Sequence, residues 1–99
     1  MSGSLRIDRW LYFCRFFKTR SKASAAVTGG HVKLNGERPG AGARVKAGDH
    51  IELVRDRLPF AFEVIAIPAR RGPATEAKSC YAEDEKVAAE RELKVATLK

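Results

Sequence analysis

Residues 6–38 read RIDRWLYFCRFFKTRSKASAAVTGGHVKLNGER, and this stretch decides the fold. Its spacing predicts a helix, a tight basic turn, a second helix and a short strand. Nine of its side chains are basic or can become so, and only Asp8 and Glu37 oppose them. The nine are Arg6, Arg9, Arg15, Lys18, Arg20, Lys22, His31, Lys33 and Arg38. A basic surface on two short helices and a strand indicates a module that binds nucleic acid.

The positive charge of the chain is concentrated in its first half. The 99 residues have a formal net charge of +7. Residues 1–50 contain ten Lys or Arg against three Asp or Glu, whereas residues 51–99 contain nine of each. Such asymmetry is typical of a protein that places one face against a polyanion. The alternative is a basic composition maintained for solubility, but solubilising charge has no reason to collect in one half.

The first predicted helix spans residues 5–17. Ile7, Leu11 and Cys14 fall on one stripe at helical spacing, and most of the basic side chains lie off it. We expect three of the aromatic side chains to pack in the core and two to lie at its rim or under the basic side chains. The core set is Trp10, Phe13 and Phe17, and the rim set is Tyr12 and Phe16.

The second predicted helix covers residues 22–28, and its small side chains let it pack closely on the first helix. Ser21 is the stronger candidate for its N-cap and Thr19 the weaker one. The Gly29-Gly30 pair ends the helix, because one glycine is free to adopt the left-handed conformation. The two helices therefore form a hairpin with a basic corner.

Alternating apolar and polar residues predict three strands, at residues 31–35, 51–53 and 60–67. Asn35-Gly36 is a turn signal, and Glu83-Asp84-Glu85 opens a C-terminal helix. The chain is thus expected to be an α+β protein, in which a helical hairpin packs on a small, mostly antiparallel sheet. We divide it into a domain at residues 5–68 and an extension at residues 69–99, made of a basic loop and the C-terminal helix.

No pattern for catalysis or for a cofactor is recognisable. His31 and His50 lie in different elements, and neither a nucleophile triad nor paired carboxylates nor metal-ligand spacing accompanies them. Gly29-Gly30 follows a predicted helix rather than a strand, so a helix end accounts for it more simply than a phosphate loop does. We predict a protein that is not an enzyme and has no metal or cofactor.

The cysteines and the hydropathy of the chain indicate its compartment. Cys14 and Cys80 are far apart in the sequence and form no Cys-x-x-Cys pair, so neither a disulfide framework nor a zinc site is predicted. This usage favours a reducing, cytoplasmic setting. No apolar run approaches the roughly 20 residues that span a bilayer, and no signal-peptide region is recognisable. We expect a cytoplasmic monomer without membrane contact.

Side chains from three neighbouring elements are predicted to form one surface for a phosphate backbone. Lys18, Arg20 and Lys22 surround the start of the second helix, where free N–H groups add to the attraction. The first helix and the exposed face of the following strand supply further donors. The predicted contact residues are Arg6, Arg9, Lys18, Thr19, Arg20, Ser21, Lys22, His31, Lys33, Asn35 and Arg38.

Four segments of the chain resemble, in order, the S4-type RNA-binding domain. They are RIDRWL at residues 6–11, FFKTRSKA at 16–23, GGHVKLNG at 29–36 and VKAGD at 45–49. That domain occurs in a small-subunit ribosomal protein, in pseudouridine synthases and in tyrosyl-tRNA synthetases. The resemblance implies the S4-like fold with its αL motif, and it implies RNA contacts at the eleven positions named above.

Within that superfamily the chain is most similar to the bacterial fifteen-kilodalton heat-shock family. The similarity adds Trp10, RRGPA at residues 70–74 and the segment at residues 76–83. It implies a small RNA-binding protein that associates with large ribosomal subunits carrying stalled peptidyl-tRNA. The implied partners are structured RNA, in the form of large-subunit ribosomal RNA, and peptidyl-tRNA. Family members usually continue into a longer basic tail, so RNA contacts from a tail stay open.

Two alternatives stay open beside this reading. One is an RNA-targeting module of an RNA-modifying enzyme such as a pseudouridine synthase. The other is a protein-interaction domain that uses the C-terminal helix, with its positive charge incidental.

Overall fold

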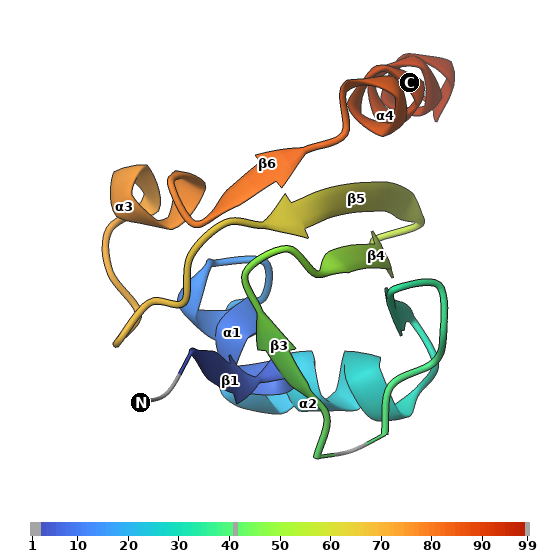
Figure 1. Ribbon diagram of the computed structural model, residues 1–99. Coiled ribbons are helices and arrows are strands. Elements are labelled where there is room, and N and C mark those ends of the chain that lie inside the picture. Colours follow the sequence, from blue (N-terminus) through green and yellow to red (C-terminus); the bar gives the residue numbers. More distant parts are fainter. Residues whose placement is uncertain (1–2, 41, 99) are drawn as a thin grey trace.

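The computed structural model describes residues 3–40 and 42–98, so Lys99 of the expected extension lies outside the described residues. The elements in chain order are β1 (Ser4–Arg6), α1 (Ile7–Phe13), α2 (Arg20–Thr28), β2 (Val32–Leu34), β3 (Arg44–Lys46), β4 (His50–Arg55), β5 (Leu58–Val64), α3 (Ala74–Lys78), β6 (Tyr81–Glu83) and α4 (Glu85–Leu98). Figure 1 shows this order in space.

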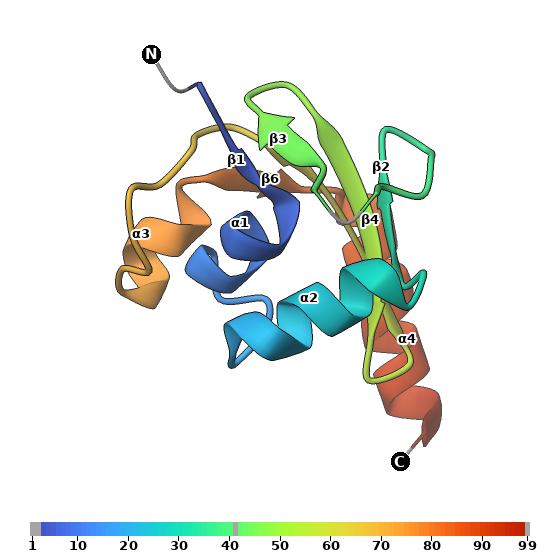
Figure 2. The same ribbon diagram turned by 90° about the horizontal axis from the view of Figure 1, so that it is seen from below.

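The strands form two antiparallel sheets. The larger has the order β2-β4-β5-β6, and the smaller pairs β1 with β3. The hairpin of α1 and α2 lies on one side of the larger sheet, and α4 lies on the other side, packed along β5 (Figure 1, Figure 2). The predicted α+β class, with a helical hairpin on a mostly antiparallel sheet and a C-terminal helix, is confirmed.

Alternation along β4 and β5 builds the sheet side of the core. Ile51 pairs with Phe62 and Leu53 pairs with Phe60, and all four side chains are buried. Asn35 and Gly36 both have left-handed backbones, with φ of 52° and 84°. The turn predicted at Asn35-Gly36 is therefore confirmed, since the tight turn that favours this residue pair needs positive φ at both positions.

The aromatic core differs from the predicted one. Trp10 is fully buried, as predicted, and its indole N–H donates to the Ala66 carbonyl at 3.1 Å. Phe16, predicted at the rim, is only 5% exposed, and its ring stacks on Phe62 with the centroids 4.3 Å apart. Phe13, predicted in the core, is partly exposed. The predicted places of Phe13 and Phe16 are therefore wrong.

The reason is that the first helix is shorter than predicted at both ends. Leu5 lies in β1 opposite Val45, and α1 ends at Phe13. Arg15 then takes a left-handed backbone with φ of 66°, and the Phe16 N–H turns back to donate to the Leu11 carbonyl at 3.0 Å. A helix continued to residue 17 would have kept Phe16 on the other face.

The end of the sheet also differs from the predicted one. β5 ends at Val64 rather than at residue 67, because the N–H groups of Ile65 and Ala66 donate to the Cys80 carbonyl at 2.8 and 3.1 Å. The short strand β6, which follows Cys80, was not predicted. The segment after residue 68 thus joins the sheet through β6 before it forms α4.

The corrected core generates a direct test. We expect Phe16→Ala to lower the free energy of unfolding by about 3 to 5 kcal/mol, because it removes a buried ring and leaves a cavity. Phe13→Ala removes the same atoms from a partly exposed site and should cost clearly less. Urea unfolding of both variants, followed by circular dichroism, measures the difference. Equal losses would show that the two rings are buried alike.

Candidate nucleic-acid interface

The start of α2 presents an uncompensated positive end. The backbone of Thr19 is extended, with φ of −134° and ψ of 156°, and its Oγ1 accepts the Lys22 N–H at 3.1 Å. Thr19 is therefore the N-cap, and the preference given to Ser21 is wrong because Ser21 lies inside the helix. The first turn contains no acidic residue, so the helix dipole is left to attract an external anion.

A groove of about 930 Å³ runs beside α2. Its walls are the segment before α2, α2 itself and the turn between β4 and β5. Of the predicted contact residues, Lys18, Lys22 and His31 line it, and all three are exposed. Figure 2 shows α2 running from the end of α1 towards β2 and β4.

Four further arginines line the same groove and are absent from the predicted set. They are Arg15, Arg55, Arg57 and Arg71. They come from three separated segments, and only the folded chain brings them to the groove. The basic runs at residues 55–57 and 70–71 are visible in the sequence, but nothing local shows that they approach α2.

Three of these arginines also hold the chain together. Arg15 donates through Nε to the Gly72 carbonyl at 2.7 Å. Arg55 donates to the Phe16 carbonyl, and its guanidinium lies over the Phe60 ring. Arg71 donates to the Tyr12 carbonyl and lies 4.9 Å from the centroid of the Tyr12 ring. Their charges are thus fixed in place at the groove.

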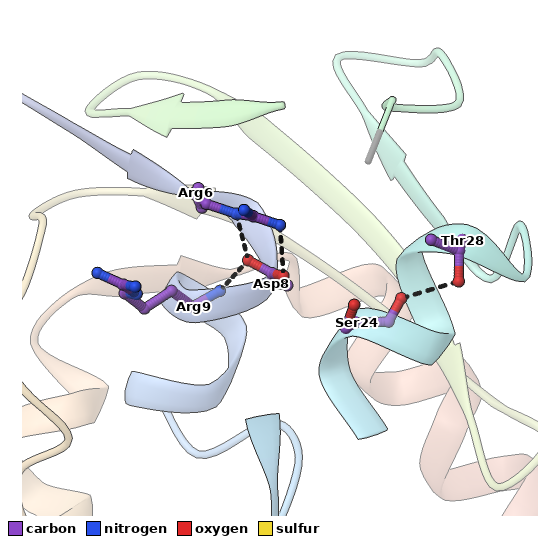
Figure 3. Close-up of polar contacts among 5 residues, drawn as sticks. All are labelled: Arg6, Asp8, Arg9, Ser24 and Thr28. Carbon is purple, nitrogen blue, oxygen red and sulfur yellow. Dashed lines mark hydrogen bonds and ion pairs between the residues drawn. The ribbon is translucent and has the colours of Figure 1, made fainter. Parts of the chain in front are cut away.

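Arg6 and Arg9 flank a buried carboxylate at the start of α1 (Figure 3). Arg6 donates to both oxygens of Asp8, through Nε at 3.3 Å and Nη2 at 3.2 Å. The backbone N–H of Arg9 donates to Asp8 Oδ1 at 2.7 Å, while its side chain is directed away from Ser24 and Thr28 of α2 (Figure 3). Arg6 therefore has a structural partner, and Arg9 does not point towards α2.

Asn35 holds the β2–β3 connection to the start of β4. Its amide N–H donates to Asp49 Oδ1 at 3.2 Å, and its oxygen accepts the His50 N–H at 2.8 Å. Burial opposes ionisation of Asp49, but hydrogen bonds from the Lys46 side chain and backbone, and from Asn35, outweigh it and lower the Asp49 pKa. These hydrogen bonds explain the position of the Asn35 side chain without a bound ligand.

Lys33 and Arg38 are not among the residues that line the groove. Lys33 projects from the sheet face opposite to that of Val32 and pairs in register with Glu52. Arg38 donates to the Thr28 carbonyl at 2.6 Å, at the negative end of α2. The structure thus gathers six predicted residues around the start of α2 and the groove. They are Lys18, Thr19, Arg20, Ser21, Lys22 and His31.

Within the described part of the chain, no three His, Cys, Asp or Glu side chains are grouped so that they could hold a metal ion. Among the same residues, no helix has the length and apolar character needed to cross a bilayer.

Comparison with known proteins identifies the family. The S4 domain family matches residues 5–51 of the chain. Heat shock protein 15 of Escherichia coli is 34% identical, over 95% of this chain and 76% of that protein. A heat shock protein 15 homolog of Haemophilus influenzae is also 34% identical, over 89% of this chain and 67% of that protein. The chain belongs to the heat shock protein 15 family.

The fold of this chain agrees with its assignment to the heat shock protein 15 family. A solved structure of Vibrio cholerae heat shock protein 15, described as trimeric, matches with a TM-score of 0.88 and 34% identity over 95% of both chains. The sequence-based assignment to the S4 domain and to the heat-shock family is confirmed. The chain is accordingly an RNA-binding protein of that family.

The Asp49 contacts predict an acid dependence of stability. The folded-state pKa of Asp49 lies below its unfolded value of about 3.9, so ionised Asp49 stabilises the fold at neutral pH. This contribution is lost as the pH falls through the folded-state pKa. Asp49→Asn should therefore be less stable at neutral pH and should lose less stability on acidification below about pH 4.

Thermal unfolding measured across this pH range checks the prediction. Asp56→Asn is the control, because the Asp56 side chain is 88% exposed and lies in the β4–β5 turn. Parallel pH profiles for Asp49→Asn and the unsubstituted protein would contradict the assigned role of Asp49.

Proposed function

We propose that the chain is a non-catalytic, cytoplasmic protein that binds structured RNA on large ribosomal subunits carrying stalled peptidyl-tRNA. Family membership supports the class of partner. The observation that supports the site is the exposed cationic start of α2 beside a groove lined by further cations. In this proposal residues 5–68 form the RNA-binding domain, and residues 69–99 form an extension.

The chemistry of the surface favours the RNA backbone over base edges. Lys18 and Lys22 are exposed point charges, and Thr19 and Ser21 add hydroxyl groups next to the N–H groups of the first helical turn. Phosphates and 2′-hydroxyls are what A-form RNA displays across its shallow groove. Binding of this kind depends on charge and shape, and it discriminates weakly between sequences.

We propose that the chain binds RNA as a monomer. The trimeric description belongs to the Vibrio cholerae relative. Light scattering at the concentrations used for RNA binding decides between the two states for this chain.

RNA binding by this surface should depend steeply on the salt concentration. If about five phosphates are contacted, the log–log plot of affinity against salt should have a slope of about −4. The triple variant Lys18→Glu, Arg20→Glu, Lys22→Glu should bind a structured RNA at least about tenfold more weakly, with a slope about 2 to 3 units shallower. Fluorescence anisotropy with a labelled ribosomal RNA hairpin measures both quantities.

A matched control separates site from net charge. Lys78→Glu, Lys86→Glu, Lys94→Glu makes the same change in charge at exposed positions of α3 and α4. We expect this variant to lose far less affinity. Equal losses in both triple variants would refute a localised site and would leave only general attraction to the positive chain.

A further prediction concerns the ribosomal partner. The protein should co-sediment with large subunits that carry peptidyl-tRNA more strongly than with empty large subunits. The Lys18, Arg20 and Lys22 triple variant should lose both associations, since both use the same cations. Equal sedimentation with loaded and empty subunits would remove peptidyl-tRNA from the proposal, and sedimentation unaffected by the triple variant would remove the site.

A further inference from the structure

The groove beside α2 is lined by apolar as well as basic side chains, and we call the apolar set its floor and the basic set its rim. Phe17, Ala25, Ala26 and Val54 line it together with the cations. Val54 is 49% exposed, because it lies on the face of β4 opposite to that of the buried Ile51 and Leu53. Phosphate groups are bound by cations and hydrogen-bond donors, so contacts to phosphate alone do not account for this apolar surface.

The dimensions of the groove suit a compact ligand. Its volume of about 930 Å³ lies within the range of about 300 to 1,000 Å³ that is typical of small-molecule pockets. The side of α2 that faces it contributes Ala25 and Ala26, whose short side chains leave the space open. Phe17, which packs on the core, supplies an aromatic ring at the same place.

The rim provides cations that are available to a ligand. Lys18, Lys22 and Arg57 are exposed, and within the described residues their side chains make no hydrogen bond or ion pair. Among the described residues Asp56 is the one carboxylate that lines the groove, and its Oδ2 lies 3.9 Å from Arg55 Nε. The rim thus keeps a positive balance around an apolar floor.

The backbone at the β4–β5 turn supports a role for Arg57. Asp56 and Arg57 both have left-handed backbones, with φ of 54° and 66°. Tight turns of this kind favour glycine at the second position, where a side chain adds strain. The strained residue is thus Arg57, whose cationic side chain lines the groove. Backbone strain of this kind is common at functional sites.

We propose that the groove holds one unpaired nucleotide of the bound RNA. The base lies against Phe17 and Val54, and the adjoining phosphates lie on Lys18, Lys22 and Arg57. A nucleobase in a duplex is stacked on both sides, so only a bulged or looped-out base can enter. This inference rests on the proposed RNA-binding function. It adds that the same surface selects RNA that has an unpaired nucleotide.

The test compares two RNA hairpins that differ by one bulged nucleotide. Stacking of one base on protein side chains corresponds to about a fivefold to a hundredfold gain in affinity. We expect the unsubstituted protein to bind the bulged hairpin at least about fivefold more tightly than the fully paired one. With 2-aminopurine as the bulged base, its fluorescence should change on binding as the base leaves water.

Two variants, together with one control, separate the floor from the rim. Ala25→Leu fills the groove without a change of charge and with little change in helix propensity. It should abolish the preference for the bulged over the paired hairpin. Ala89→Leu makes the same change at an exposed position of α4 and should retain the preference. Arg57→Gly should weaken binding of the bulged hairpin and melt at the same or a higher temperature.

The outcomes distinguish the two proposals. Equal affinity of the unsubstituted protein for both hairpins would overturn the nucleotide pocket and leave the proposed RNA function intact. Absence of salt-dependent binding to either hairpin would overturn the proposed function itself. An Ala25→Leu variant that keeps the full preference for the bulge would place the unpaired base outside the groove.

Discussion

The return of Phe16 into the core is the constraint on which the rest of the structure depends. Arg15 adopts a left-handed backbone, and Phe16 then stacks on Phe62 of β5. This contact fixes the end of the first helix against the sheet and so determines where α2 can begin. The cap at Thr19 and the basic start of α2 follow directly from that position. The candidate interface is thus positioned by an apolar contact.

The features that the sequence predicts correctly have local signals. The alternation of β2, the helix end at Gly29-Gly30 and the turn at Asn35-Gly36 each depend on residues within a few positions of one another. The basic corner at residues 18–22 is equally local, because composition and the helix start define it. Such patterns specify the class of fold and the region of the candidate site.

The features that were missed depend on distant partners. The pairing of Leu5 with Val45 and the bond from Trp10 to Ala66 have no signal in the residues on either side. Helical spacing alone predicts that the first helix continues through Phe16, since no neighbouring residue indicates the left-handed backbone of Arg15. The groove has no signal in the sequence for the same reason, because the β4–β5 turn and α2 are distant in the sequence and line one groove only in the folded chain.

The basic side chains divide into two groups with different physical roles. Arg6 and Arg38, like three of the four arginines of the groove, donate hydrogen bonds to the chain itself. A planar guanidinium is suited to this, because it can bridge fixed acceptors and still present charge. Lys18 and Lys22 make no such side-chain bonds to described residues, and a flexible ammonium can follow a phosphate without a fixed geometry. Most of the groove arginines therefore also hold the chain together, whereas the side chains of Lys18, Lys22 and Arg57 make no hydrogen bond or ion pair to described residues. Net charge alone thus overstates how many cations are available to RNA.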